Sequence, residues 1–386
     1  TAMTSVVYYS SRIVHSLSLT KLQDFHGVVG VDSKSGTIVS IEKLADFKAD
    51  DAKQVINFRN KFIVPGFVDT HTHAPQFVNR GLGLDMPLMQ WLETYTFPKE
   101  AKCKDIDYAT TVFSKIVDMT IKNGTTTCCY FATIHPKSAV ELAKITLKRG
   151  QRAFIGKVNM DMESPKFYIE ETKSSLQTTE DTINDIFKLQ SYDCKKQKPS
   201  TIYDLLAIPI ITPRFVPTCS DELMKGLANL AEKYQLPIQS HLAESPGESD
   251  FVKSRFPNES YTEVYKRMNL LNDRTIMAHC IYLSTEDIQL IKKCGASIAH
   301  CALSNFDLSS GILCAKTLLA AGVKTGLGTD VSGGYAPDML STIRFTAVAS
   351  AATEINNRSK DSKSTYRKLK NSELFYLATL GGAEAL

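Results

Sequence analysis

The chain has 386 residues, 43% of them hydrophobic, which is enough to bury the core of one large domain or of a large and a small one. Its 45 basic and 41 acidic residues give a net charge of +4, too weak a field to indicate a nucleic-acid partner. No apolar run reaches the ~18 residues that a membrane span needs, and the N-terminus lacks a signal-peptide pattern. The nine cysteines include no C-x-x-C pair, which indicates reduced thiols and a cytoplasmic location.

Residues 1–60 are expected to form a small β domain. Short strands are predicted at 5–10, 27–32 and 37–43, and a turn at 33–36 separates the last two.

From residue 61 the pattern changes to strands that alternate with helices. The predicted strands are 62–68, 125–131, 153–160, 205–211, 237–241, 275–279, 297–300 and 323–329. The predicted helices include 106–122, 136–149, 221–234, 285–293 and 315–321, and the polar stretch 356–370 is expected to be a loop. Eight apolar strands alternating with helices predict an α/β fold, a (β/α)8 TIM-like barrel over residues 61–386. An open doubly wound sheet is the alternative, but no G-x-G-x-x-G or Walker-type loop follows the first strand.

Polar side chains follow several of these strands. His71 and His73 come after the first, and side chains two apart on a strand point to the same side. An H-x-H pair alone is a weak sign of a metal site, so its weight depends on ligands from other strands. A barrel places its catalytic residues at the C-terminal ends of different strands. The further polar residues at such ends are Arg214, His241, Glu244, His279, His300 and Asp330.

Three nitrogens and one oxygen, a plausible zinc shell with room for water, would come from His71, His73, His241 and Asp330. His279 is a fifth ligand, a neighbour that hydrogen-bonds the water, or a core imidazole. Asp330 has a second interpretation as the cap of the helix that follows.

Other residues are expected to assist. Glu244, in H-x-x-E, fits a proton shuttle, with an exposed loop glutamate as the alternative. Asp69 is expected to support the ligands, and Trp91 to pack in the core or to form a pocket wall. Lys157, internal to a strand, needs a partner that the sequence does not identify. The segment 76–98 is the candidate lid, while His135, His300 and Asn305 are interpreted as mainly structural or supporting.

Together these motifs resemble the amidohydrolase superfamily, and more narrowly its deaminase and chlorohydrolase branch. The motifs that carry the resemblance are PGFVDTHTH at 65–73, HLAE at 241–244, MAH at 277–279, HCALSN at 300–305 and GLGTD at 326–330. Further stretches are similar to the guanine deaminases: WLETYTFP at 91–98, KNGTTT at 122–127 with YFAT at 130–133, GQRA at 150–153 with GK at 156–157, and TPRF at 212–215. The resemblance covers about residues 61–386. One departure is CAL at 301–303, where the family more often has a proline before Ser-Asn.

The resemblance implies a zinc enzyme, usually a homodimer, that converts guanine to xanthine and ammonia in purine catabolism. One Zn²⁺ per chain would be bound by His71, His73, His241 and Asp330. Glu244, His279 and Asp330 would move protons and position the water. The purine would be contacted by Gln76, Arg214, Phe215 and Glu244, with Trp91 as a wall. Arg214 would lie near O6, Phe215 would stack on the ring, and Gln76 would bind a ring edge.

Two other functions remain open from the sequence. One is a related aminohydrolase acting on another purine, a pterin or a triazine. The other is a catalytically inactive barrel that serves as a scaffold, although such a protein would be expected to have lost metal ligands. The family also has a C-terminal segment that completes the small β-sandwich, and without it that domain is expected to be incomplete.

Overall fold

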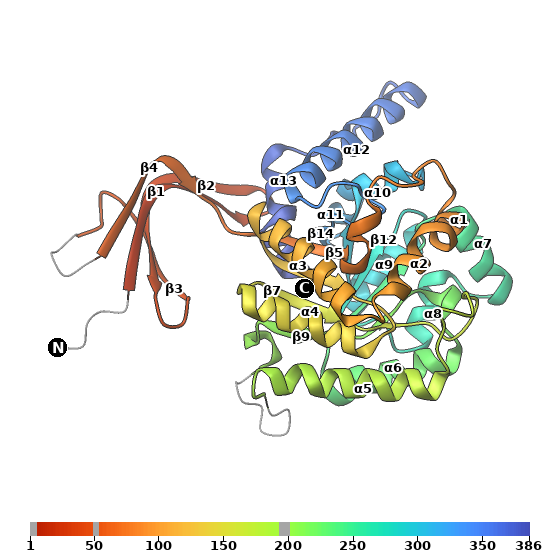
Figure 1. Cartoon of the computed structure of the whole chain (residues 1–386). Coiled ribbons are helices and arrows are strands. Elements are labelled where there is room, and N and C mark those ends of the chain that lie inside the picture. Colours follow the sequence, from red (N-terminus) through yellow and green to blue (C-terminus); the bar gives the residue numbers. More distant parts are fainter. Residues whose placement is uncertain (1–5, 49–53, 193–200) are drawn as a thin grey trace. The chain divides into compact units, whose positions relative to one another are not determined.

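The structure, a computed structural model, describes residues 6–48, 54–192 and 201–386 (Figure 1). The chain divides into two compact units, Thr1–Gly66 and Phe67–Leu386.

The first unit is a four-stranded sheet. Its strands are β1 (Val6–Ser18), β2 (Lys21–Asp32), β3 (Ile38–Lys43) and β4 (Gln54–Ile63), in the order β3-β2-β1-β4. β1 pairs antiparallel with β2 and parallel with β4. The three predicted strands are present, β1 and β2 are longer than predicted, and β4 was not predicted. The second layer of the expected sandwich stays a prediction.

The second unit is the predicted TIM-like barrel. Its strands are β5 (Phe67–His73), β6 (Thr125–Phe131), β7 (Arg152–Gly156), β9 (Ala207–Pro209), β11 (Ile238–Leu242), β12 (Thr275–His279), β13 (Ser297–His300) and β14 (Lys324–Leu327). They form two parallel sheets, β5-β6-β7-β9 and β11-β12-β13-β14. A bridge between Ile211 and Ile238 joins the sheets on one side. On the other side, Asp330 N donates to His71 O at 2.9 Å and His73 N donates to Val331 O at 3.0 Å, which closes the cylinder.

Helices surround these strands (Figure 1). The longer ones are α3 (Ile106–Lys122), α4 (Pro136–Arg149), α5 (Thr172–Leu189), α6 (Asp221–Tyr234), α7 (Pro246–Arg255), α8 (Tyr261–Arg267), α9 (Thr285–Cys294), α12 (Met339–Lys360) and α13 (Asn371–Ala378). Successive pairs from α3 to α6 are in contact. Local signals set their ends: Asp105 caps α3 through the N–H groups of Asp107 and Tyr108, and Gly150, at φ 71°, ends α4.

Short elements carry the chain across the barrel mouth and between the longer ones. They are η1 (Ala74–Asn79), α1 (Leu88–Trp91), η2 (Leu92–Thr96), α2 (Phe97–Lys102), β8 (Val158–Asn159), η3 (Ile202–Asp204), β10 (Thr212–Pro213), η4 (Val216–Thr218), α10 (Ala302–Asp307), α11 (Ala315–Ala320) and α14 (Leu380–Ala385). β8 pairs with β10. None of the helices in the described ranges combines the length and hydropathy that a bilayer-spanning segment requires.

Three predicted boundaries are wrong. The first barrel strand is not 62–68 but β5, which includes both histidines. The extended segment is interrupted after β4 at Pro65 and Gly66, because proline has no N–H to donate in a sheet. The predicted strand 153–160 is two strands, β7 and β8, separated at Lys157. The first five residues of the expected loop 356–370 belong to α12.

Gly156 lies where β7 approaches side chains of two other strands. A Cβ built on Gly156 would lie 2.0 Å from Thr212 Oγ1 and 2.4 Å from Gln239 Nε2. We expect Gly156→Ala to lower the free energy of unfolding by about 1–3 kcal/mol through overpacking, measured by chemical denaturation. The matched control is Gly247→Ala in α7, because that glycine is exposed and a Cβ there would meet no atom within 4 Å. Equal losses in the two variants would contradict the assigned packing.

Candidate active site

Strand β5 delivers three polar side chains to the barrel mouth. Asp69, His71 and His73 alternate with Val68, Thr70 and Thr72, so they share one side of the strand, and all three are buried. Asp69 accepts hydrogen bonds from His71 N at 3.2 Å, Thr329 N at 3.0 Å and Thr329 Oγ1 at 2.6 Å. Asp69 therefore ties β5 to the residue that precedes Asp330.

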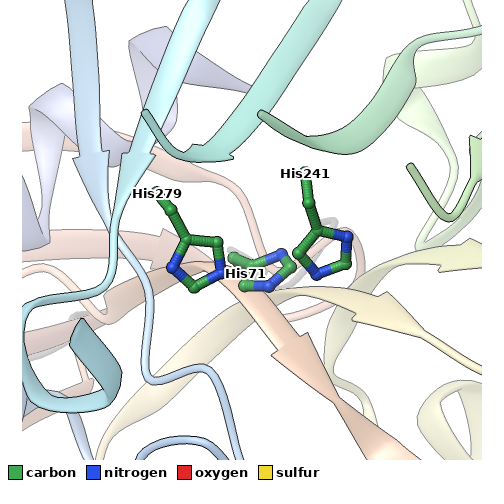
Figure 2. Close-up of side chains that lie close together, drawn as sticks. All are labelled: His71, His241 and His279. Carbon is green, nitrogen blue, oxygen red and sulfur yellow. The ribbon is translucent and has the colours of Figure 1, made fainter. Parts of the chain in front are cut away.

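The four predicted metal ligands converge from three strands. His73 Nε2 lies 3.2 Å from His241 Nε2, and Asp330 Oδ1 lies 3.2 Å from His71 Nε2 and 3.4 Å from His73 Nε2. Figure 2 shows His71, His241 and His279 turned toward one another. Donor atoms of these three histidines lie within 4.8 Å of one another, as do those of His71, His73 and Asp330.

Hydrogen bonds at the outer ring nitrogens orient two of the imidazoles. His241 Nδ1 lies 2.7 Å from Arg214 O, and His279 Nδ1 lies 2.9 Å from Asn305 Oδ1. Both oxygens are acceptors, so each Nδ1 carries the proton and each Nε2 presents its lone pair to the cluster. Asn305 thus supports His279.

The charges of the cluster suit a cation. Burial lowers the pKa values of His73 and His241 well below the ordinary range, so both rings are neutral. Burial alone would raise the pKa of Asp330, but the close approach of His71 Nε2, at 3.2 Å, outweighs burial and holds that pKa low. Within the described residues, His71 Nε2 and His73 Nδ1 are buried without hydrogen-bond partners. Neutral imidazoles, a carboxylate and an orphaned lone pair are the donor set that zinc binds.

The backbone at three strand ends adopts a left-handed conformation. Ala243, His279 and Asp330 have φ values of 49°, 68° and 46°. This conformation costs non-glycine residues on the order of 1 kcal/mol each and is concentrated at functional sites. Here it turns the chain where the polar side chains leave the strands.

Glu244 lies on the pocket side of the cluster. Its Oε2 is 3.4 Å from His279 Nε2, and His279 Nε2 is in turn 3.7 Å from Asp330 Oδ2. Its backbone N–H donates to Glu248 Oε2 at 3.0 Å. Burial, and then the charge of Asp330, raises the pKa of Glu244 well above its ordinary value. The raised pKa favours the protonated form of Glu244, which is the form that can donate a proton.

A pocket with about 370 Å³ of empty volume, open solvent included, lies beside these groups. It is lined by His73, Gln76, Leu88, Trp91, Leu92, Arg214, Phe215, His241, Glu244, His279, Leu308 and Asp330. The five residues expected at the purine, Gln76, Arg214, Phe215, Glu244 and Trp91, are among them. The predicted lid segment, 76–98, contributes Gln76, Leu88, Trp91 and Leu92, and it includes the end of η1, all of α1 and η2, and the start of α2. His135 and His300 do not line the pocket.

Glu100 was not predicted as a site residue. This fully buried residue pairs with Arg214, so the charge of the guanidinium expected near O6 is already compensated. Glu100 lies on α2 rather than at a strand end, and the one available signal was that a buried arginine requires a carboxylate. Lys157 is likewise a buried cation that requires a carboxylate, and its partner is Glu170.

Comparison with known proteins agrees with this geometry. The model of the amidohydrolase family matches residues 62–386, and the chain therefore belongs to the amidohydrolase family. A guanine deaminase of Dictyostelium discoideum is 44% identical over 98% of this chain and 83% of the relative. A guanine deaminase of Homo sapiens is 43% identical over 92% of this chain and 76% of the relative. The crystal structure of a guanine deaminase from C. acetobutylicum with bound guanine superposes with a TM-score of 0.88 at 36% identity, covering 98% of this chain and 86% of that one.

His300 makes the native state sensitive to acid. Neither ring nitrogen has a hydrogen-bond partner in the described part of the chain, and burial lowers its pKa to about 4. An unfolded histidine titrates near 6.5, so this contribution to stability is full above pH 6.5 and is lost as the pH falls through 4. At 1.36 kcal/mol per pKa unit the loss is about 3 kcal/mol. Between pH 7 and pH 4, we expect the free energy of unfolding of His300→Leu to fall by about 3 kcal/mol less than that of the parent, measured by urea denaturation. Identical pH dependences would contradict the assignment.

Proposed function

We propose that this protein is a guanine deaminase that hydrolyses guanine to xanthine and ammonia. The observation that carries the proposal is the convergence of His71, His73, His241 and Asp330 next to Glu244 and beside one pocket. Similarity to guanine deaminases over nearly the whole chain supports the choice of substrate.

His71, His73, His241 and Asp330 would hold one zinc ion per chain. The donor set fits such an ion, since the rings are neutral and the carboxylate is ionised. When bound, zinc supplies the Lewis acidity that makes water a competent nucleophile at neutral pH.

The protein's own groups move the protons. As water adds to C2 of the purine, Glu244 donates its proton to N3. The water's proton passes to Asp330, and His279 Nε2, which faces both carboxylates, carries a proton back to Glu244. Glu244 then protonates the amine and the C2–N bond breaks. The second proton of the water, on the C2 hydroxyl, returns to Glu244 by way of Asp330 and His279 as the 2-oxo group forms, so xanthine and ammonia leave and Glu244 is protonated again. The balance is one water consumed and one ammonia released.

The purine would be recognised by residues at the other end of the pocket. Phe215 would stack on the ring, and Trp91 would form a wall. The N–H groups of Arg214 would bind O6, and the amide of Gln76 would bind a ring edge. A pocket built around these hydrogen bonds should discriminate against adenine by about 10⁴-fold, because adenine would leave buried donors unpaired.

We also propose the domain boundaries, the cellular location and the oligomeric state. The catalytic barrel comprises residues 61–386, the small β domain comprises residues 1–60, and the active form is a cytoplasmic homodimer. Among the described residues the cysteines are free thiols, which is consistent with a reducing compartment.

Removal of one ligand tests the metal site. We expect His241→Ala to lose bound zinc and guanine turnover together, because the variant lacks one of the four proposed ligands and its binding free energy. Zinc is measured by elemental analysis, and xanthine formation by absorbance with and without chelator. The control is His135→Gln, at a histidine outside the pocket, which should keep zinc. Full activity of His241→Ala without zinc would contradict the assignment.

Replacing the proton donor separates chemistry from metal binding. We expect Glu244→Gln to retain zinc and to lose guanine turnover by about 10²-fold or more, because the amide has no acidic proton to give. Ammonia release from guanine, adenine, adenosine and a chlorotriazine is measured in parallel on the parent protein. Normal guanine turnover by Glu244→Gln would contradict the role of Glu244 as proton donor. Faster ammonia release by the parent protein from another compound of the panel would contradict guanine as the substrate.

A further inference from the structure

Glu100 is a buried carboxylate that the proposed reaction does not use. Its Oε1 accepts from Gln76 Nε2 at 2.8 Å and Arg214 Nη2 at 3.2 Å. Its Oε2 accepts from Arg214 Nη1 at 2.8 Å and Tyr168 Oη at 2.7 Å. These four bonds fill the acceptor positions of a carboxylate. Glu100 has none of its surface exposed and does not line the pocket, whereas Gln76 and Arg214 do. Any effect of Glu100 on a ligand must therefore act through these two side chains.

The bidentate pair fixes the plane of the Arg214 guanidinium. A fork-to-fork arrangement uses one N–H on each terminal nitrogen and leaves the others to point elsewhere. Those remaining N–H groups are donors only, so the part of the pocket next to Arg214 favours an acceptor on the ligand.

Glu100 also fixes which end of the Gln76 amide is the donor. Gln76 Nε2 donates to Glu100, and Gln76 Oε1 accepts from Ser332 N at 3.2 Å. A flipped amide would set its oxygen against a carboxylate and its NH₂ against a backbone N–H. Both contacts would be unfavourable, so the amide is locked in one orientation.

We propose that Glu100 is a positioning residue that makes the pocket selective for purines with a 6-oxo group. This inference rests on the proposed function. The edge of guanine that carries O6 and N7 presents two acceptors, whereas 2-aminopurine has the same 2-amino group and N7 but no O6. Glu100 thus sets the donor pattern that recognises the oxo group, while the metal ligands and Glu244 act on the amino group common to both compounds.

The test compares kcat/KM for guanine and for 2-aminopurine in the parent protein and in Glu100→Gln. The variant leaves Arg214 uncompensated and brings an NH₂ group against its donors, so both pocket residues lose their fixed positions. We expect kcat/KM for guanine to fall about 10²-fold, as misplacement of binding groups does. With 2-aminopurine the fall should be at most about threefold, since the contact to O6 is absent. Zinc content should stay at the parent level.

Two further variants make the result decisive. Glu170→Gln breaks a second cation–carboxylate pair, between Lys157, which is buried, and Glu170, which is partly buried, and neither residue lines the pocket. It should destabilise the fold without changing the ratio of the two kcat/KM values. Tyr168→Phe removes one hydrogen bond to Glu100 and keeps both charges. It should lower the guanine to 2-aminopurine ratio by about threefold to tenfold, as loss of a charge-assisted hydrogen bond does, and it replaces Glu100→Gln if that variant does not fold.

Equal losses for the two substrates in Glu100→Gln, or an unchanged ratio in Tyr168→Phe, would overturn the inference and leave the proposed function intact. An inactive parent protein would instead overturn the proposed function, and the selectivity inference with it.

Discussion

The burial of several metal-binding side chains within a few ångströms of one another is the constraint on which this structure depends. His73 Nε2 lies 3.2 Å from His241 Nε2 and 3.4 Å from Asp330 Oδ1, and all three side chains are buried. Donors that crowd together out of water are unfavourable unless a cation or protons compensate them. The surrounding protein favours compensation by a cation, because burial keeps the imidazoles neutral and Asp69 holds the backbone around Asp330.

Arg214 connects this cluster to the opposite end of the pocket. Its carbonyl oxygen accepts the proton of His241 Nδ1, and its guanidinium pairs with Glu100. A single residue at the end of β10 thus orients one metal-binding ring through the backbone and one wall of the pocket through the side chain. The proposed chemistry and the proposed recognition of the substrate would therefore be coupled through a short, buried stretch of chain.

The barrel and the cluster could be predicted because parallel strands bring their C-terminal ends to one face. This rule needs only approximate strand positions: the first strand was misplaced by five residues at each end, and His71 and His73 still shared a side. Residues that reach the site from helices obey no comparable rule. Glu100 on α2 and Glu248 on α7 are typical helix glutamates in the sequence, and only the folded chain gives Arg214 and Glu244 these partners. The partner of Lys157, Glu170, likewise lies in an irregular segment.

The most direct measurement is anomalous X-ray diffraction from crystals of the protein, recorded on both sides of the zinc absorption edge. This account predicts one anomalous peak per chain, with His71, His73, His241 and Asp330 as ligands at about 2.0–2.2 Å. Absence of a peak among these four side chains in zinc-saturated crystals, or a peak bound by other residues, would contradict it.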